Sequence, residues 1–145
     1  MQLSTGLRNY LISSGSLKAA LDGSEIRLYS GTMPTSANDA MPAGASLLCT
    51  VTVDDTGTGI TFETGSAGTL LKNTSEVWEG TVANTGEAAW FRIVAPADVD
   101  DSSTTAVRLQ GSVAAAGADM QITDPSLVAG EPQRVDYLSV VMPAA

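Results

Sequence analysis

The chain has 145 residues, of which 43% are hydrophobic and 16% charged, and its formal net charge at pH 7 is -9. The length predicts a single domain with its own core, and the acidic balance argues against a nucleic-acid partner, because phosphate binding needs many lysines and arginines. The sequence has no histidine and one cysteine, Cys49, which excludes imidazole-based catalysis, an internal disulfide and a four-ligand zinc site.

The N-terminal part of the chain has a helical pattern, with apolar side chains recurring at Leu7, Tyr10, Leu11, Leu17 and Leu21. Thr5 is the expected N-cap, and Gly15 between two serines is expected to break the helix into two short pieces. We therefore expect one domain over 1–145, with a helical segment at 1–22 and a β-sandwich at 23–145.

Membrane insertion and export are not expected from this sequence. The longest apolar runs, such as 140–145, are far shorter than the roughly 18 residues that span a bilayer. Residues 1–11 lack the apolar stretch of a secretory signal peptide. We expect no membrane partner and a protein that stays in the cytoplasm where it is made.

From Glu25 onward the hydrophobic period changes from 3.6 to 2, which predicts strands. Turn clusters rich in Gly, Asp, Asn and Ser separate these strands. About eight short strands without intervening helices predict an all-β fold, an antiparallel jelly-roll β-sandwich with a short N-terminal helix. The alternation sets Arg27, Arg108 and Gln110 opposite the apolar face, as in half-buried strands.

Two strands and one loop depart from this pattern. Residues 90–94 and 135–142 carry apolar side chains on both faces. Each is therefore either a central strand covered on both sides, or a strand whose second face a partner covers. The long loop at 31–46 is rich in Met, Pro and Ala, which favours docking onto another surface over free motion.

Two acidic motifs have both a catalytic or metal-binding interpretation and a structural one. Asp55-Thr56-Gly57 matches the aspartic-protease tripeptide, but its glycine-rich continuation is typical of a hairpin turn. Asp98, Asp100 and Asp101 offer oxygens to a cation such as Ca²⁺, although their spacing is not that of an EF-hand and a solvated turn is the simpler interpretation. We expect no enzymatic activity and no cofactor.

The scarcity of lysine is the most informative count, because the chain has only Lys18 and Lys72. Free monomers usually guard exposed sheet edges with lysine, and lysine is depleted where proteins stay associated. A sheet protein with two lysines and no catalytic constellation is typical of a component of an assembly.

Several segments resemble a family of small virion proteins of tailed bacteriophages and prophages: LSTGLRN (3–9), GSLK (15–18), IRLYSGT (26–32), VWEGT (77–81), WFR (90–92) and VRLQG (107–111). Within it the chain is similar to jelly-roll cement, or decoration, proteins such as that of a short-tailed Bordetella phage. The resemblance implies a non-enzymatic protein on the outer surface of the head. Such a protein joins subunits of the major capsid protein and forms a homodimer or homotrimer.

We expect the partner contacts at three places: the N-terminal segment, the 33–41 loop and the strand face that carries Trp90. Their residues are Leu3, Leu7, Tyr10, Leu11, Met33, Met41 and Trp90. Two alternatives stay open. One is a tail or baseplate component, and the other is a carbohydrate-binding sandwich that uses Trp78 or Trp90 as a sugar platform.

Overall fold

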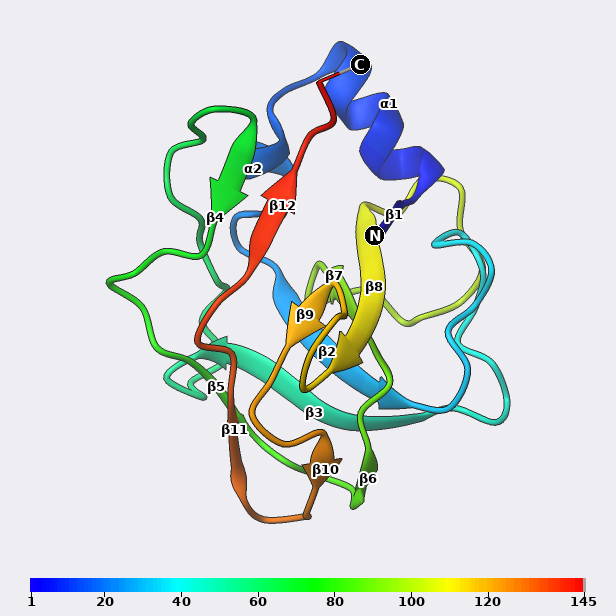
Figure 1. Ribbon diagram of the computed structural model, residues 1–145. Helices are drawn as coiled ribbons and strands as arrows, with labels where there is room; N and C mark the ends of the chain where they lie inside the picture. The colour runs from blue at the N-terminus through cyan, green and yellow to red at the C-terminus, as the bar shows by residue number, and fades with distance from the viewer. Residues whose placement is uncertain (145) are drawn as a thin grey trace.

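The computed structural model describes residues 1–144, and the all-β antiparallel fold with a short N-terminal helix is confirmed (Figure 1). The large sheet has the order β1-β8-β7-β2-β3-β5-β11, with β9 paired parallel to β8. Two further sheets, β10-β6 and β12-β4, have two strands each. The elements are β1 (Gln2–Leu3), α1 (Thr5–Ser13), α2 (Leu17–Leu21), β2 (Glu25–Ser30), β3 (Ser46–Val53), β4 (Thr69–Leu71), β5 (Trp78–Thr81), β6 (Gly86–Glu87), β7 (Trp90–Val94), β8 (Arg108–Ala114), β9 (Met120–Gln121), β10 (Ser126–Leu127), β11 (Pro132–Arg134) and β12 (Ser139–Val141).

The helical segment begins one residue earlier than the sequence pattern suggests. Ser4, not Thr5, caps α1, because its hydroxyl oxygen accepts a hydrogen bond from the Leu7 N–H at 3.1 Å. The expected break at Gly15 is confirmed: α1 ends before it, and Ser16 caps α2. Within the described residues, neither helix is long and apolar enough to cross a membrane.

Both faces of the central strands of the large sheet, β2, β7 and β8, are covered. One face packs into a hydrophobic core that includes Ile26, Phe91 and Leu109 and is completed by residues of β4, β12 and β10. The opposite face of β2, β7 and β8 lies beneath the loops 31–45 and 95–106, which hydrogen-bond to it. The arrangement is that of a sandwich in which small sheets form one cover and loops the other.

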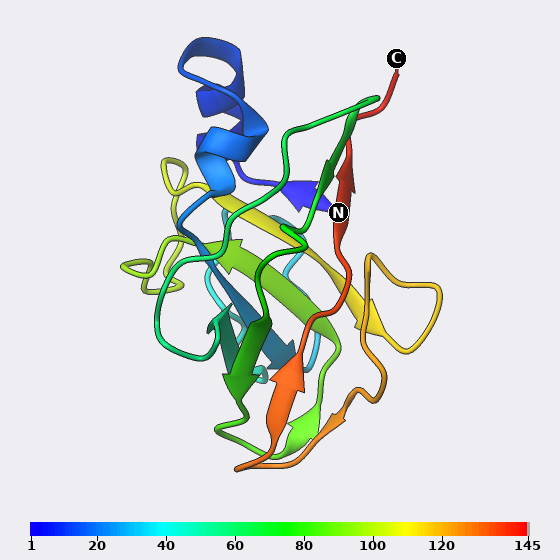
Figure 2. The same ribbon diagram turned by 90° about the vertical axis from the view of Figure 1, so that its left-hand side faces the viewer.

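The two ends of the molecule are built from different secondary-structure elements. Both helices lie at one end, together with the C-terminal end of β12, while β6, β10 and β11 lie at the opposite end (Figures 1 and 2).

The two segments with apolar residues on both faces, 90–94 and 135–142, differ in how far the structure buries them. All five residues of β7 are buried, because β7 lies between β2 and β8 in the middle of the large sheet. In the 135–142 segment, Tyr137, Val141 and Met142 are exposed while Val140 is buried. The segment around Ile60 forms only isolated bridges, from Ile60 to Ser24 and from Phe62 to Lys72.

Candidate interaction surface

The polar face of the large sheet is not open to solvent, which corrects the expectation of half-buried strands. Arg27, Arg108 and Gln110 are buried, and so is Arg92. Alternation predicted their direction correctly, but the loops 31–45 and 95–106 cover them. The buried arginines and the aspartates that pair with them are called the arginine cluster below.

Asp98 anchors the 95–106 loop to β8 through a bidentate pair with Arg108. Arg108 Nε donates to Asp98 Oδ2 at 2.7 Å and Nη2 donates to Oδ1 at 2.8 Å. Burial opposes ionisation, but the bonds from Arg108 and from the Asp100 N–H prevail, so the pKa of Asp98 lies below its ordinary value. The carboxylate is therefore charged and fully engaged at neutral pH.

Asp100 connects two arginines and a tyrosine from the same sheet face. Its Oδ2 accepts from Arg27 Nη1 at 2.9 Å and from the Tyr29 hydroxyl at 2.5 Å, and its Oδ1 accepts from Arg92 Nη1 at 3.2 Å. Burial, and then the hydrogen bond to Asp100, raise the pKa of Tyr29, so the phenol remains a neutral donor. Asp100 has a positive φ of 60°, a left-handed backbone conformation that aspartate adopts more readily than most residues.

The arginine cluster accounts for the acidic loop at 98–101. Asp98 and Asp100 face arginines, and only Asp101 remains exposed. Among the described residues there is no group of three or more His, Cys, Asp or Glu side chains that could hold a metal ion. The loop is thus neither a solvated turn nor an open cation site.

We predict that Asp98 contributes stability only while it is ionised. Because its folded pKa is depressed, this contribution is present above the unfolded pKa of about 3.9 and is lost as the pH falls through the folded value. Urea unfolding at pH 7, 5 and 3 should show a gap in unfolding free energy between wild type and Asp98→Asn that shrinks only at the lowest pH. A gap of constant size would contradict a role for the charge.

The Asp55-Thr56-Gly57 tripeptide forms the turn after β3, as the hairpin interpretation predicts. Asp55 and Gly57 both have positive φ, and Val53 pairs with Thr58 across the turn. The Asp55 carboxylate accepts a hydrogen bond from the Thr81 hydroxyl at 2.7 Å and lies at the exposed surface. This open turn has none of the enclosure that a proton-sharing carboxylate pair requires.

The expectation that Leu7 and Trp90 contact a partner is wrong, because both side chains are fully buried. Leu7 lies on the inner side of α1, in the main core. Trp90 stacks on Tyr29 with ring centroids 4.1 Å apart, and its Nε1 donates to the Ser30 carbonyl at 3.3 Å. Trp90 therefore holds β7 and β2 together.

Trp78 is also unavailable as a sugar platform. It is 1% exposed, packs edge-on against Phe62 and donates its indole N–H to Glu76 at 2.8 Å. The Lys72 ammonium lies 5.1 Å from the centre of its ring. With both tryptophans inside the protein, the carbohydrate-binding alternative loses the residues on which it depended.

The remaining five predicted contact residues reach the surface to different degrees. Leu3, Leu11 and Met33 are partly buried against apolar clusters, and Tyr10 is half-buried. Met41 is 36% exposed. Its backbone N–H donates to the Asp100 carbonyl at 2.9 Å, so the 31–45 loop docks onto its own domain.

Folding removes most positive charge from the surface. Of seven lysines and arginines, four are buried: Arg27, Lys72, Arg92 and Arg108. Lys18 and Arg134 pair with carboxylates, and Arg8 donates to Thr5. The exposed surface is therefore poorer in lysine than the composition suggests, while the buried arginines take their aspartate partners with them.

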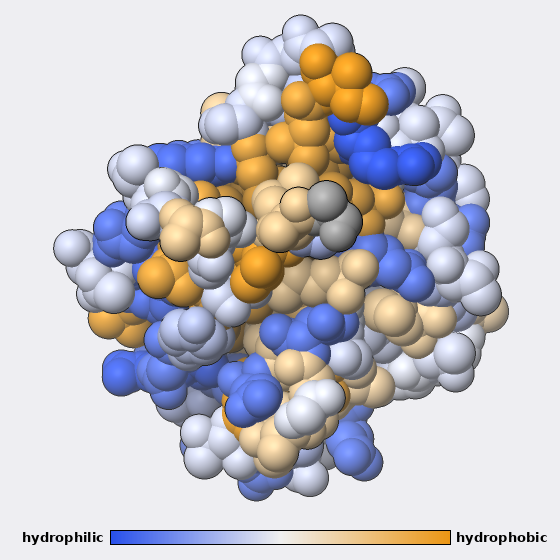
Figure 3. All heavy atoms as spheres, turned by 45° about the horizontal axis from the view of Figure 1, so that its top comes forward, coloured by the Kyte–Doolittle hydropathy of each residue, from blue (hydrophilic) through white to orange (hydrophobic). Residues whose placement is uncertain are grey.

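Exposed apolar side chains gather at the helical end, around β12 (Figure 3). A groove of about 570 Å³ lies along β12, and we call it the β12 groove; it is lined by Met1, Leu3, Asp119, Ser139, Val140, Val141, Met142 and Pro143. A second hollow of about 400 Å³ adjoins Val140 and Met142 and is bounded by α2 and the 64–70 segment. The apolar residues on both faces of 135–142 indicated this surface in the sequence. None of the seven predicted partner-contact residues comes from that segment.

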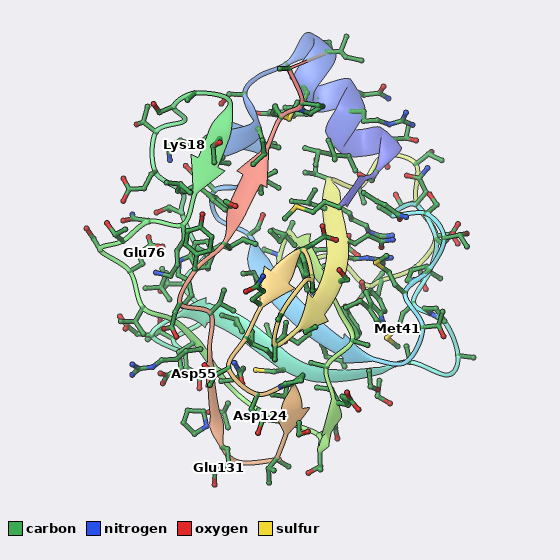
Figure 4. The ribbon with its side chains drawn as sticks, in the orientation of Figure 1. Lys18, Met41, Asp55, Glu76, Asp124 and Glu131 are labelled. Carbon is green, nitrogen blue, oxygen red and sulfur yellow. The ribbon has the colours of Figure 1, made fainter. Side chains whose placement is uncertain are left out.

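The opposite end of the molecule is acidic. Asp55, Asp124 and Glu131 lie there, near β11 and β10 (Figure 4). The protein thus has an apolar end and an acidic end, which suits attachment in one orientation.

Comparison with protein-family models, with curated proteins and with solved structures finds no match for this chain. Its function must therefore be argued from its own residues and geometry.

Proposed function

We propose that this chain is a structural protein of a tailed-phage virion, which binds the outer surface of the head and cements neighbouring major capsid protein subunits. The observation that carries the proposal is the exposed apolar surface around β12, on a domain whose polar interior is sealed by its own ion pairs. Large exposed apolar patches mark interaction sites. The sequence resemblance described above supplies the identity of the partner.

The proposed mechanism is mechanical. Pressure from packaged DNA pulls capsid subunits apart, and a protein bound across their boundary adds interface free energy that must be lost before they separate. A specific interface buries about 1,200–2,000 Å², and repetition over many sites converts modest affinity into a stable shell. Ion pairs fix loop 95–106 to the sheet, and hydrogen bonds from Arg92 and Gln110 to backbone carbonyls fix loop 31–45. These contacts favour a domain that transmits load without deforming.

The test compares two exposed valines at opposite ends of the molecule. Val141 is 62% exposed on β12, and Val128 is 54% exposed just after β10. We expect wild type to bind empty preformed shells and to raise their melting temperature. Val141→Lys should weaken binding by about tenfold or more, because a buried lysine must lose its hydration, whereas Val128→Lys should bind as wild type.

Calorimetry and cosedimentation of shells with each variant provide the measurement. Equal binding by the two lysine variants would contradict a role for the β12 end. If wild type leaves shells unchanged, and gold-labelled protein marks the tail in negative-stain images, the head assignment is wrong and the tail or baseplate alternative replaces it.

A further inference from the structure

The free edge of β12 presents backbone groups without partners. Lys72 N–H donates to the Leu138 carbonyl at 3.0 Å, and Met142 N–H donates to the Gly68 carbonyl at 2.8 Å. Even-numbered residues of β12 therefore bond to β4, and antiparallel alternation turns the N–H and C=O of Ser139 and Val141 away from it. Among the described residues, neither of these amide groups has a hydrogen-bond partner on that side.

The opposite wall of the β12 groove also offers free backbone. Ser4 N–H donates to the Arg108 carbonyl at 2.9 Å. In the register of β1 and β8, the even-numbered residues Gln2 and Ser4 are therefore the ones that hydrogen-bond to β8. By the same alternation Leu3 directs its N–H and C=O away from β8, and Leu3 lines the groove. Two strand edges thus border one apolar groove.

The groove is large enough to hold a short strand segment. One residue of a packed strand occupies about 160 Å³, from a rise of about 3.3 Å, a strand spacing of about 4.8 Å and a sheet spacing of about 10 Å. A volume of about 570 Å³ therefore holds three to four residues, which is the length of β12. Pro143, which has no N–H, lies at the next outward position and ends the ladder without leaving a donor unpaired.

The charges of the groove restrict what it accepts. The Met1 ammonium and the Asp119 carboxylate, 3.0 Å apart, are the charged groups in its lining and neutralise each other. The net charge of -9 disfavours the approach of an acidic segment, most strongly at low ionic strength.

We propose that the β12 groove takes an extended, uncharged or basic segment of a partner polypeptide as an added strand beside β12. The inference rests on the proposed function in taking that segment to belong to a capsid subunit. Strand addition obtains its affinity from main-chain hydrogen bonds and its selectivity from alternate side chains. Val140, which points into the domain, and Leu3 supply the apolar contacts for those side chains.

The probe is a capped hexapeptide of alternating valine and threonine with a lysine at each end, added to ¹⁵N-labelled full-length protein. We expect shifts of the Ser139 and Val141 amide resonances and slower hydrogen exchange of both amides, with a Kd near or below about 1 mM. A peptide with glutamate at each end should bind several-fold more weakly. A peptide N-methylated at all four central residues should not bind, because neither of its edges can donate hydrogen bonds to a strand.

Val141→Pro is the decisive variant, because it removes an outward N–H while leaving the β4 ladder intact. It should lower peptide affinity about tenfold or more, whereas the matched control Val141→Thr keeps the N–H and should bind as wild type. Unchanged Ser139 and Val141 resonances at saturating peptide, or equal binding of the N-methylated peptide, would overturn the proposal. So would concentration-dependent shifts of these amides without peptide, which would make a second copy the occupant.

The peptide titration tests strand addition and the shell assay tests the proposed function, so either one can fail without the other. Shell binding without peptide binding would leave the proposed function standing and remove strand addition. Peptide binding without shell binding would leave the groove as a strand acceptor for another partner.

Discussion

Asp100→Asn is expected to lower the free energy of unfolding by about 3–5 kcal/mol, the usual cost of removing one partner from a buried ion pair. Asp100 joins Arg27, Arg92 and Tyr29, and the Arg92 side chain is fully buried. Asparagine keeps the shape and tolerates the positive φ of this position. The loss therefore reports the missing charge, with a buried guanidinium left without its counter-ion.

Urea unfolding and calorimetry at pH 7 measure this loss, which corresponds to a fall in Tm of about 6–20 °C. The neighbouring Asp101→Asn is the matched control, because the Asp101 side chain is exposed and only its backbone carbonyl accepts from Arg108. It should change stability by no more than about 0.5 kcal/mol. Similar effects of the two variants would show that the Asp100 pairs contribute little.

Leu7→Ala is expected to cost about 2–5 kcal/mol, because Leu7 is fully buried and its removal leaves a cavity in the core beneath α1. Ile12→Ala in the same helix is the matched control. Ile12 is 83% exposed, so its truncation should change stability by no more than about 0.5 kcal/mol. Denaturant midpoints of the two variants, measured side by side, test this difference.

The Leu7 result also decides how the N-terminal segment is studied. Deleting 1–11 removes Leu7 together with Ser4, whose hydroxyl caps α1 and also donates to the Ala106 carbonyl at 2.7 Å. We expect such a truncation to unfold, so that its failure to bind a shell would carry no information on contacts. If Leu7→Ala retained wild-type stability, the truncation would become a usable test.

The cysteine and the two acidic motifs of this chain all have structural roles. Burial raises the pKa of the Cys49 thiol to about 12, so the single cysteine is an inert part of the core. The acidic tripeptide is a turn, and the acidic loop is bound to arginines. The exposed apolar end and the acidic end remain as the features through which substitution can change binding without changing the fold.

Much of the architecture follows from the sequence alone. A period of 2 after Glu25 and the break at Gly15 each reflect local backbone preference, and the structure confirms both. For the 135–142 segment, apolar residues on both faces predict either a central strand or a strand whose second face a partner covers. The structure gives β12 in a two-stranded sheet, with Val140 buried and Val141 exposed. Two exposed residues of the segment, Val141 and Met142, line the β12 groove at the apolar end of the molecule.

What the tertiary structure decided is which surfaces are covered, and by what. Alternation gives the direction of Arg27, Arg108 and Trp90. It does not show that two loops about 50 residues apart in sequence close over the same face and supply Asp100 and the Asp39 carbonyl. For the same reason Leu7 and Trp90 could be mistaken for contact residues, since an amphipathic pattern does not distinguish a face buried by the domain from one buried by a partner. Side-chain direction is a local property of the backbone, whereas burial depends on long-range contacts.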